Sequence, residues 1–116
     1  MTRADRARLA DVVTAVGAIH DHLARGALDD GLIYDAVRVR LIEIGEAVKD
    51  ISTDLLENEP NVPWRAIARM RDHLAHRYFD TDHAIVVDVV ETELEPLRTA
   101  VDALLARLDA EESDTE

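Results

Sequence analysis

The chain has 116 residues, a formal net charge of −12 and no cysteine. This length is typical of a single domain, and the lack of cysteine excludes a disulfide framework and any thiolate metal site. The acidic composition argues against broad, non-specific binding of nucleic acid, which depends on Lys and Arg, but it does not exclude a small basic site. The N-terminal residues do not resemble a signal peptide, and no apolar run is long enough to span a membrane. We therefore expect one cytoplasmic domain with no membrane segment.

Apolar residues in two early segments alternate steps of three and four, which places them on one stripe of a helix. The stripes are Leu9, Val12, Val16, Ile19 and Leu23 in the first segment, and Val37, Leu41, Ile44, Val48, Ile51 and Leu55 in the second. Between them, "RGALDDG" at residues 25–31 breaks the pattern, and Asp29 or Asp30 can cap the second helix. The two segments predict consecutive helices joined by a short loop.

A third helix is expected after "ENEPNVP" at residues 57–63, which ends the second stripe. Proline is tolerated in the first turn of a helix, where its missing N–H group is not needed, and Pro63 fits that position. The third helix should therefore include Trp64 and run to about His76 or Tyr78.

The last part of the chain predicts a fourth helix that is interrupted. "FDTDH" at residues 79–83 is expected to form a turn, with Asp80, Thr81 or Asp82 as the next N-cap. "IVVDVV" at residues 85–90 is β-branched and could be a strand by propensity alone, but no other segment offers a partner strand, so we expect a helix. Pro96 should break or kink this last helix. Its final stripe is Leu97, Val101, Leu104 and Leu108.

These elements predict an all-α fold, an antiparallel up-and-down four-helix bundle with the last helix broken near Pro96. Residues 1–110 would form the bundle, and residues 111–116 an acidic, disordered tail. The apolar stripes suit packing inside one bundle and also pairing with a second copy. We expect two copies to form a two-fold dimer.

The stretch "MRDHLAHRYFD" at residues 70–80 gathers two of the four aromatic residues and two of the five histidines of the chain. In a helix that starts at Trp64, Arg71 falls in the middle of the apolar face. A charge there is costly unless it is paired, hydrogen-bonded or facing a polar cleft. Arg71 is therefore either an ion-paired structural residue, with Glu43 or Glu46 as its partner, or part of a functional site.

Arg71 and His76 are five positions apart, which in an ideal helix separates their side chains by about 140°. They do not share a face. If they act together, either the helix ends between them or a second copy of the protein supplies the missing member at a two-fold axis.

The spacing Arg71, four residues, His76, one residue, Tyr78 resembles the signature of the HepT-like toxins within the HEPN ribonuclease superfamily. Two further segments resemble that family at the expected places, namely "LIEIGEAVKDIS" at residues 41–52 and "VPWRAIARMRD" at residues 62–72. A lone Arg-x4-His pattern would be a weak signal, but three segments in order on a helical chain of this size make a strong one. The resemblance extends from about Leu9 to Leu108.

The resemblance implies a metal-independent ribonuclease that uses the RNA 2′-hydroxyl as nucleophile and leaves a 2′,3′-cyclic phosphate. His76 would move the proton, because imidazole titrates near neutral pH. Arg71 would stabilise the charge on the phosphorane-like transition state. Asp72, His73 and Arg77 would support them. We expect no metal site and no cofactor, since no carboxylate completes an evident ligand set with the two histidines.

The same resemblance implies a toxin–antitoxin system. Its partner would be a minimal, MntA-like nucleotidyltransferase antitoxin that silences the toxin by adding AMP to the motif tyrosine, here Tyr78. Two alternatives stay open. The chain could be a non-catalytic HEPN-like dimeric module that binds a nucleotide or a protein, or a helical dimer in which Arg71 is only an ion-paired core residue.

Overall fold

The fold consists entirely of helices in the part of the chain that the structure describes. A computed structural model describes the backbone of residues 3–76 and 79–115, with the side chains of residues 4–76 and 82–113. The elements are α1 (Arg3–Arg25), α2 (Gly31–Lys49), α3 (Thr53–Leu56), α4 (Trp64–Ala75), α5 (Phe79–Asp88), the π-helical turn η1 (Val89–Glu93) and α6 (Leu94–Thr115). The prediction of an all-α fold is confirmed.

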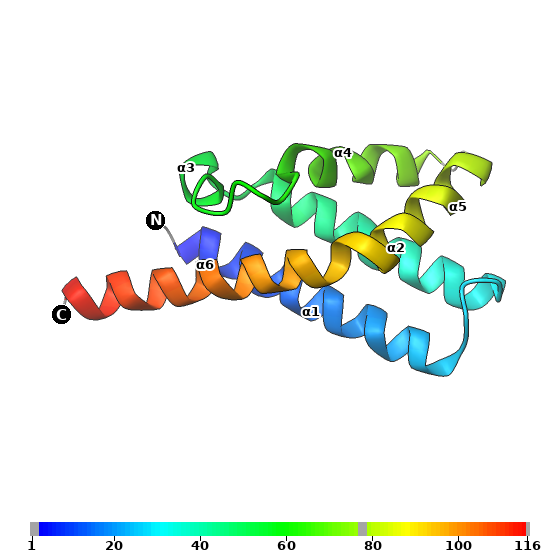
Figure 1. The fold of residues 1–116 in the computed structure, drawn as a ribbon, viewed down its shortest axis with the longest axis horizontal. Coiled ribbons are helices and arrows are strands. Elements are labelled where there is room, and N and C mark those ends of the chain that lie inside the picture. The colour runs from blue at the N-terminus through cyan, green and yellow to red at the C-terminus, as the bar shows by residue number, and fades with distance from the viewer. Residues whose placement is uncertain (1–2, 77–78, 116) are drawn as a thin grey trace.

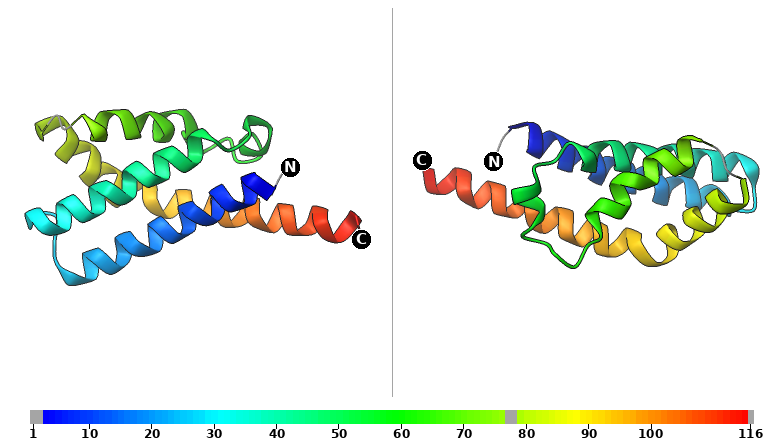
Figure 2. Two further views of the ribbon diagram at one scale, coloured as in Figure 1. Left: turned by 180° about the vertical axis from the view of Figure 1, so that it is seen from behind. Right: turned by 90° about the horizontal axis from the view of Figure 1, so that it is seen from above.

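The long helices run in alternating directions along one axis (Figure 1). α2 packs against α1 on one side and against α4 on the other, and α6 packs against α1. The molecule is elongated, 50 × 25 × 21 Å, and both termini lie at the same end (Figure 2). The expected count of four helices differs from the structure, which adds the short α3 and divides the last stretch into α5, η1 and α6.

The core is built from the predicted stripes. The first stripe is buried at Leu9, Val12, Val16 and Ile19, and the last at Leu97, Val101, Leu104 and Leu108. Each helix therefore turns one apolar face inward, which is what the three-and-four spacing requires. Within the described ranges, no helix combines the length and the hydrophobicity that a membrane crossing requires.

Two caps explain where α2 and α4 begin. The Asp30 carboxylate accepts a hydrogen bond of 2.9 Å from the Leu32 N–H group, so Asp30 is the N-cap of α2, as expected. Pro63 is the N-cap of α4 rather than its first helical residue. The loop before α4 is anchored by the Trp64 indole, whose Nε1–H group donates to the Glu59 carbonyl oxygen at 2.9 Å.

The prediction of a turn at residues 79–83 is wrong, because α5 begins at Phe79. Residues 80–82 then lie in the first turn of α5 rather than before it, a position where carboxylates interact favourably with the helix N-terminus. Asp82 is only 2% exposed, so it faces the protein interior. Residues 85–90 are helical, as expected, and belong to α5 and η1.

The interruption expected near Pro96 is displaced toward the N-terminus. Pro96 lies in the first turn of α6, and the irregular segment is the π-helical turn η1, which ends at Glu93. Proline has no N–H group and its ring crowds the carbonyl four residues earlier, which is Thr92. A π-helical turn at that point changes the hydrogen-bond spacing where the proline disturbs it.

The acidic C-terminal stretch, which we expected to be disordered, continues α6 as far as Thr115. Arg6 at the start of α1 forms ion pairs with Asp109 and with Glu112, the latter at 2.8 Å. These pairs hold the end of α6 beside the start of α1.

Candidate active site

α2 and α4 approach closely at Gly45. A Cβ atom placed at Gly45 would lie 2.8 Å from the Arg71 Cβ atom and 3.1 Å from both the Arg71 nitrogen and the Ile67 carbonyl oxygen. Real Cβ atoms are not found at such distances, so this contact needs a residue without a side chain. The close approach places the neighbouring residue, Glu46, beside Arg71.

Arg71 binds two carboxylates. Its guanidinium forms an ion pair with Glu46 on α2 and donates from Nη1 to the Asp72 carboxylate at 3.0 Å. The hydrogen bond to Asp72, together with the charge of Glu46, raises the pKa of the Arg71 guanidinium above its usual value. Of the two partners predicted for Arg71, Glu46 is the one observed, whereas Glu43 pairs with Arg40 at 2.6 Å.

His76 is the C-cap of α4. Its Nδ1 atom lies 2.5 Å from the Asp72 carbonyl oxygen. A carbonyl oxygen can only accept, so Nδ1 donates, and in a neutral ring Nε2 is then the nitrogen that can take up a proton. The ring is exposed. This geometry suits His76 to proton transfer with a molecule that arrives from solvent.

Asp72 connects the two residues. Its carboxylate binds Arg71 and its backbone carbonyl accepts the proton of His76 Nδ1. Arg71 itself turns toward α2, whereas His76 lies at the end of α4. Within one chain the two groups are therefore joined through Asp72, in agreement with their wide separation around the helix.

Of the other predicted site residues, one lies in the described part of the chain and two lie outside it. His73 is exposed on α4. It lines a groove of about 380 Å³ between α4 and the segment formed by α5 and η1, together with Arg69, Met70 and Val89. Arg77 and Tyr78 lie outside the described residues. No group of three or more His, Asp or Glu side chains in the described part of the chain is arranged to hold a metal ion.

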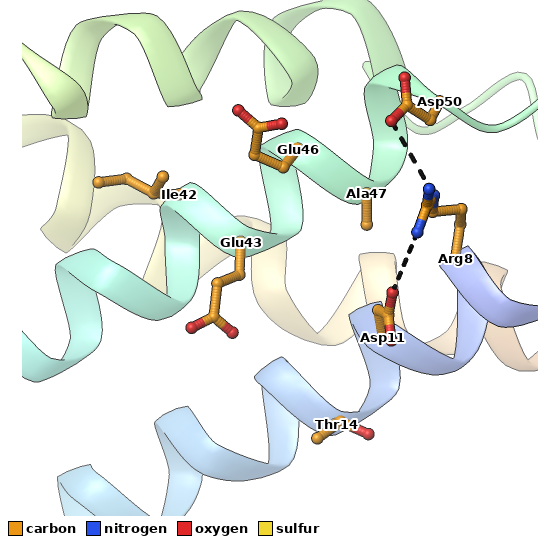
Figure 3. Close-up of a pocket in the computed structure, with 8 residues that line it drawn as sticks. All are labelled: Arg8, Asp11, Thr14, Ile42, Glu43, Glu46, Ala47 and Asp50. Carbon is orange, nitrogen blue, oxygen red and sulfur yellow. Dashed lines mark ion pairs between the residues drawn. The ribbon is translucent and has the colours of Figure 1, made fainter.

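A second hollow borders the site from the other side of α2 (Figure 3). It measures about 410 Å³ and is lined by Arg8, Asp11, Thr14, Ile42, Glu43, Glu46, Ala47 and Asp50. Arg8 lies 3.8 Å from the Asp11 carboxylate and 3.9 Å from that of Asp50. With four carboxylates and one arginine, this hollow repels a phosphate. Glu46 extends from its rim toward α4, where it meets Arg71.

Sequence analysis missed a polar cluster at the junction of α2, α4 and α5. Arg38 is only 7% exposed, and its Nη2 atom donates to the Leu74 carbonyl oxygen at 2.5 Å. Tyr34 stacks on His83 with ring centroids 5.2 Å apart. Burial, and then the nearby Asp82 carboxylate, raise the pKa of the Tyr34 hydroxyl. Helical spacing places Arg38 on the same side of α2 as Leu41 and Gly45, but it does not indicate a partner for the Arg38 charge.

Comparisons with known proteins show the family to which the chain belongs. A family model described as "Ribonuclease HepT-like" matches residues 12–104. The chain is 32% identical over 102 residues to "Probable ribonuclease HepT" of Thermococcus cleftensis, which covers 84% of this chain and 93% of the relative. It is 43% identical over 63 residues to "Putative RNase MJ0127" of Methanocaldococcus jannaschii, covering 54% of this chain and 52% of that protein.

A further relative is "Putative RNase TTE0752" of Caldanaerobacter subterraneus subsp. tengcongensis, 39% identical over 70 residues, which is 60% of this chain and 62% of that protein. The chain thus spans nearly the whole length of one relative but only about half to two thirds of the other two. No solved structure matches the chain.

Proposed function

The chain belongs to the HepT-like ribonuclease family, and we propose that it is an endoribonuclease that cleaves RNA without a metal ion, using Arg71 and His76. The observation that carries this proposal is the double role of Asp72. Its carboxylate binds Arg71 and its carbonyl fixes the ring of His76. One short segment thus supplies a permanent cation and a proton acceptor with a defined tautomer, which are two of the groups that the reaction requires.

In the proposed reaction, His76 Nε2 accepts the proton of the RNA 2′-hydroxyl as its oxygen attacks the adjacent phosphorus. The bond from phosphorus to the 5′-oxygen breaks, and this oxygen takes up a proton, leaving a 2′,3′-cyclic phosphate and a 5′-hydroxyl. Arg71 stabilises the negative charge on the non-bridging phosphate oxygens. To do so, its guanidinium exchanges Glu46 or Asp72 for the phosphate.

We propose a two-fold dimer as the active form. Arg71 turns toward α2, whereas His76 lies at the end of α4, so a second copy packed around that end would bring its own His76 near Arg71. The exposed apolar side chains of Leu32 and Val39, 78% and 44% exposed on α2, offer further surface for such a contact. Light scattering at micromolar concentration tests this, since a monomer would contradict it.

We further propose that the enzyme is the toxin of a toxin–antitoxin system. A minimal nucleotidyltransferase would silence it by adding AMP to Tyr78, which brings bulk and negative charge to a position two residues after His76 in the sequence. Co-expression with such a partner, followed by intact-mass spectrometry, tests the proposal. The mass should rise by whole AMP units, and Tyr78→Phe should abolish that rise while leaving RNA cleavage intact. A partner that leaves the mass of the unsubstituted protein unchanged would refute this mechanism.

The second candidate is a non-catalytic module of the same family. It is favoured by the pairing of Arg71 with two carboxylates on a body with a net charge of −12, because RNA must displace those carboxylates and approach against that charge.

Cleavage of structured and unstructured RNA in EDTA separates the two candidates. His76→Ala should lower the rate about 10²- to 10⁴-fold, and Arg71→Ala should have an effect of similar size. His20→Ala is the matched control, since His20 is also exposed and pairs with Glu95 on a distant surface. If His76→Ala cuts RNA as fast as the parent, the ribonuclease assignment to this site is wrong. A large fall in Tm on Arg71→Ala would instead support a purely structural arginine.

A further inference from the structure

We propose that Arg38 is a positioning residue that fixes the last turn of α4 and thereby holds His76 in the tautomer that can accept a proton. This inference rests on the proposed ribonuclease function for its consequence in catalysis. The effect of Arg38 on the tautomer of the His76 ring does not depend on that function.

The contact of Arg38 is with a backbone group that α4 itself leaves unpaired. The last four carbonyl groups of a helix have no partner inside the helix. Leu74 contributes one of them to α4, which ends at Ala75, and Arg38 Nη2 donates to it at 2.5 Å. Leu74 is two residues before His76. Arg38 thus supplies the missing donor at the turn that carries the histidine.

The close approach of Gly45 to α4 relates the position of Arg38 on α2 to the candidate site. Arg38 and Gly45 are seven residues apart, two turns of α2, and so lie on the same side of that helix. Gly45 lies against the backbone of α4 at Arg71, and Arg38 lies against it at Leu74. The two helices run in opposite directions, so the contacts lie near the two ends of the segment from Arg71 to His76. Together they hold this segment of α4 against α2. Gly45 sets the position of Arg71, and Arg38 sets that of His76.

The burial of Arg38 indicates that its charge is held for a specific contact. An arginine that is 7% exposed has lost most of its hydration, which is unfavourable unless the guanidinium is paired and hydrogen-bonded. Asp82 on α5 is buried as well, and its Oδ1 atom has no hydrogen-bond partner among the residues that the structure describes. Both charges lie close enough to the Tyr34 hydroxyl to act on its pKa in opposite directions. The cluster therefore joins α2 to the end of α4 and to α5.

Loss of the Arg38 contact should loosen the last turn of α4. The carbonyl groups of Leu74 and Asp72 belong to that same turn, and the Asp72 carbonyl is the acceptor for His76 Nδ1. A weaker bond to Nδ1 raises the population of the other neutral tautomer, in which Nε2 carries the proton. His76 would then present a protonated Nε2 for part of the time. Arg71, held by Gly45 and Glu46, would keep its place.

The test uses the full chain and reads the His76 ring directly. Nitrogen-15 NMR at about pH 8.5, where histidine is neutral, distinguishes the two tautomers. The His76 signals are assigned by their loss in His76→Ala. The parent should show the Nδ1–H tautomer, and Arg38→Met should show a mixture. Arg38→Lys, which keeps a donor, should restore the parent spectrum. If Arg38→Met does not fold, Arg38→Leu, which also lacks a donor, replaces it with the same expectation.

Val101→Ala is the control for stability alone. Val101 is fully buried in α6, so its truncation should lower Tm without changing the tautomer. A parent-like spectrum in both Arg38→Met and Arg38→Leu, or a mixture of tautomers in Val101→Ala, would overturn the proposal.

In RNA cleavage, Arg38→Met should lower kcat about tenfold to hundredfold, as expected for a displaced reacting group, while KM changes little. If the parent cuts no RNA but the tautomer still depends on Arg38, the positioning role stands and the ribonuclease function fails. The two proposals are therefore tested separately.

Discussion

Gly45→Ala tests whether the close approach of α2 and α4 needs a residue without a side chain. The new Cβ atom would lie 2.8 Å from the Arg71 Cβ atom and 3.1 Å from two backbone atoms of α4. Backbone atoms cannot rotate away as a side chain can, so α4 has to shift. Overpacking of this kind costs about 1–3 kcal/mol. In a helix interior, alanine is otherwise favoured over glycine by about 1 kcal/mol. The net loss in the free energy of unfolding should be about 0–2 kcal/mol.

Gly17→Ala is the matched control. Gly17 lies inside α1 as Gly45 lies inside α2, but a Cβ atom there meets nothing within 4 Å. This variant should gain up to about 1 kcal/mol. The two variants should then differ by the overpacking cost of about 1–3 kcal/mol, which for a domain of this size is a difference in Tm of about 3–15 °C, as measured by circular dichroism. If Gly45→Ala melts at the same temperature as Gly17→Ala, the helices do not depend on glycine at their contact, and the placement of Arg71 has another cause.

Three further substitutions probe separate contacts. Glu46→Gln removes a carboxylate that competes with phosphate for Arg71, so RNA affinity in fluorescence anisotropy should rise about twofold to fivefold, as for an exposed ion pair; a weaker affinity would show that Glu46 assists binding. Because the pKa of Tyr34 is raised by burial and by Asp82, its contribution to stability is complete below about pH 10 and is lost as the pH rises through the folded-state pKa. Tyr34→Phe should therefore show a shallower fall of Tm above that pH than the parent, and parallel curves would contradict this. Asp5, 3% exposed, accepts hydrogen bonds of 2.9 Å from both the N–H and the hydroxyl of Ser52; Asp5→Ala should cost about 1–3 kcal/mol in a urea titration, and an unchanged midpoint would refute the contact.

The parts of the structure that follow from helical periodicity were predictable. The spacing of apolar residues indicates which face of each helix is buried, and the same phase placed Arg71 on the inner side of α4 with Glu43 or Glu46 as its partner. The structure selects Glu46. That choice depends on the rotation of α2 about its axis. Gly45 fixes this rotation by letting α4 approach, and periodicity alone does not specify it.

The parts that depend on backbone groups or on competing local preferences were not predictable. Asp82 could cap a helix or lie within its first turn, because both positions favour a carboxylate, and the sequence gives no means of choosing. Arg38 was missed because charged residues are normally placed outside, and its acceptor is the carbonyl of Leu74, 36 residues away. A backbone carbonyl is present at every position, so a contact with one leaves no pattern in the sequence.

The distribution of charge on α4 is the feature that would allow an acidic protein to accept RNA at one place, as the proposed function requires. Arg65, Arg69, His73 and His76 are exposed and lie within about 80° of one another around the helix. On the far side of α2, four carboxylates surround the hollow of Figure 3. A phosphate chain is therefore attracted along the exposed face of α4 and repelled from the surface between α1 and α2. Arg71 lies between these two surfaces, and its resting partner, Glu46, belongs to the acidic one. In the proposed ribonuclease, opposed charges on two neighbouring surfaces would direct RNA to the motif, whereas the net charge of −12 would disfavour binding elsewhere on the molecule.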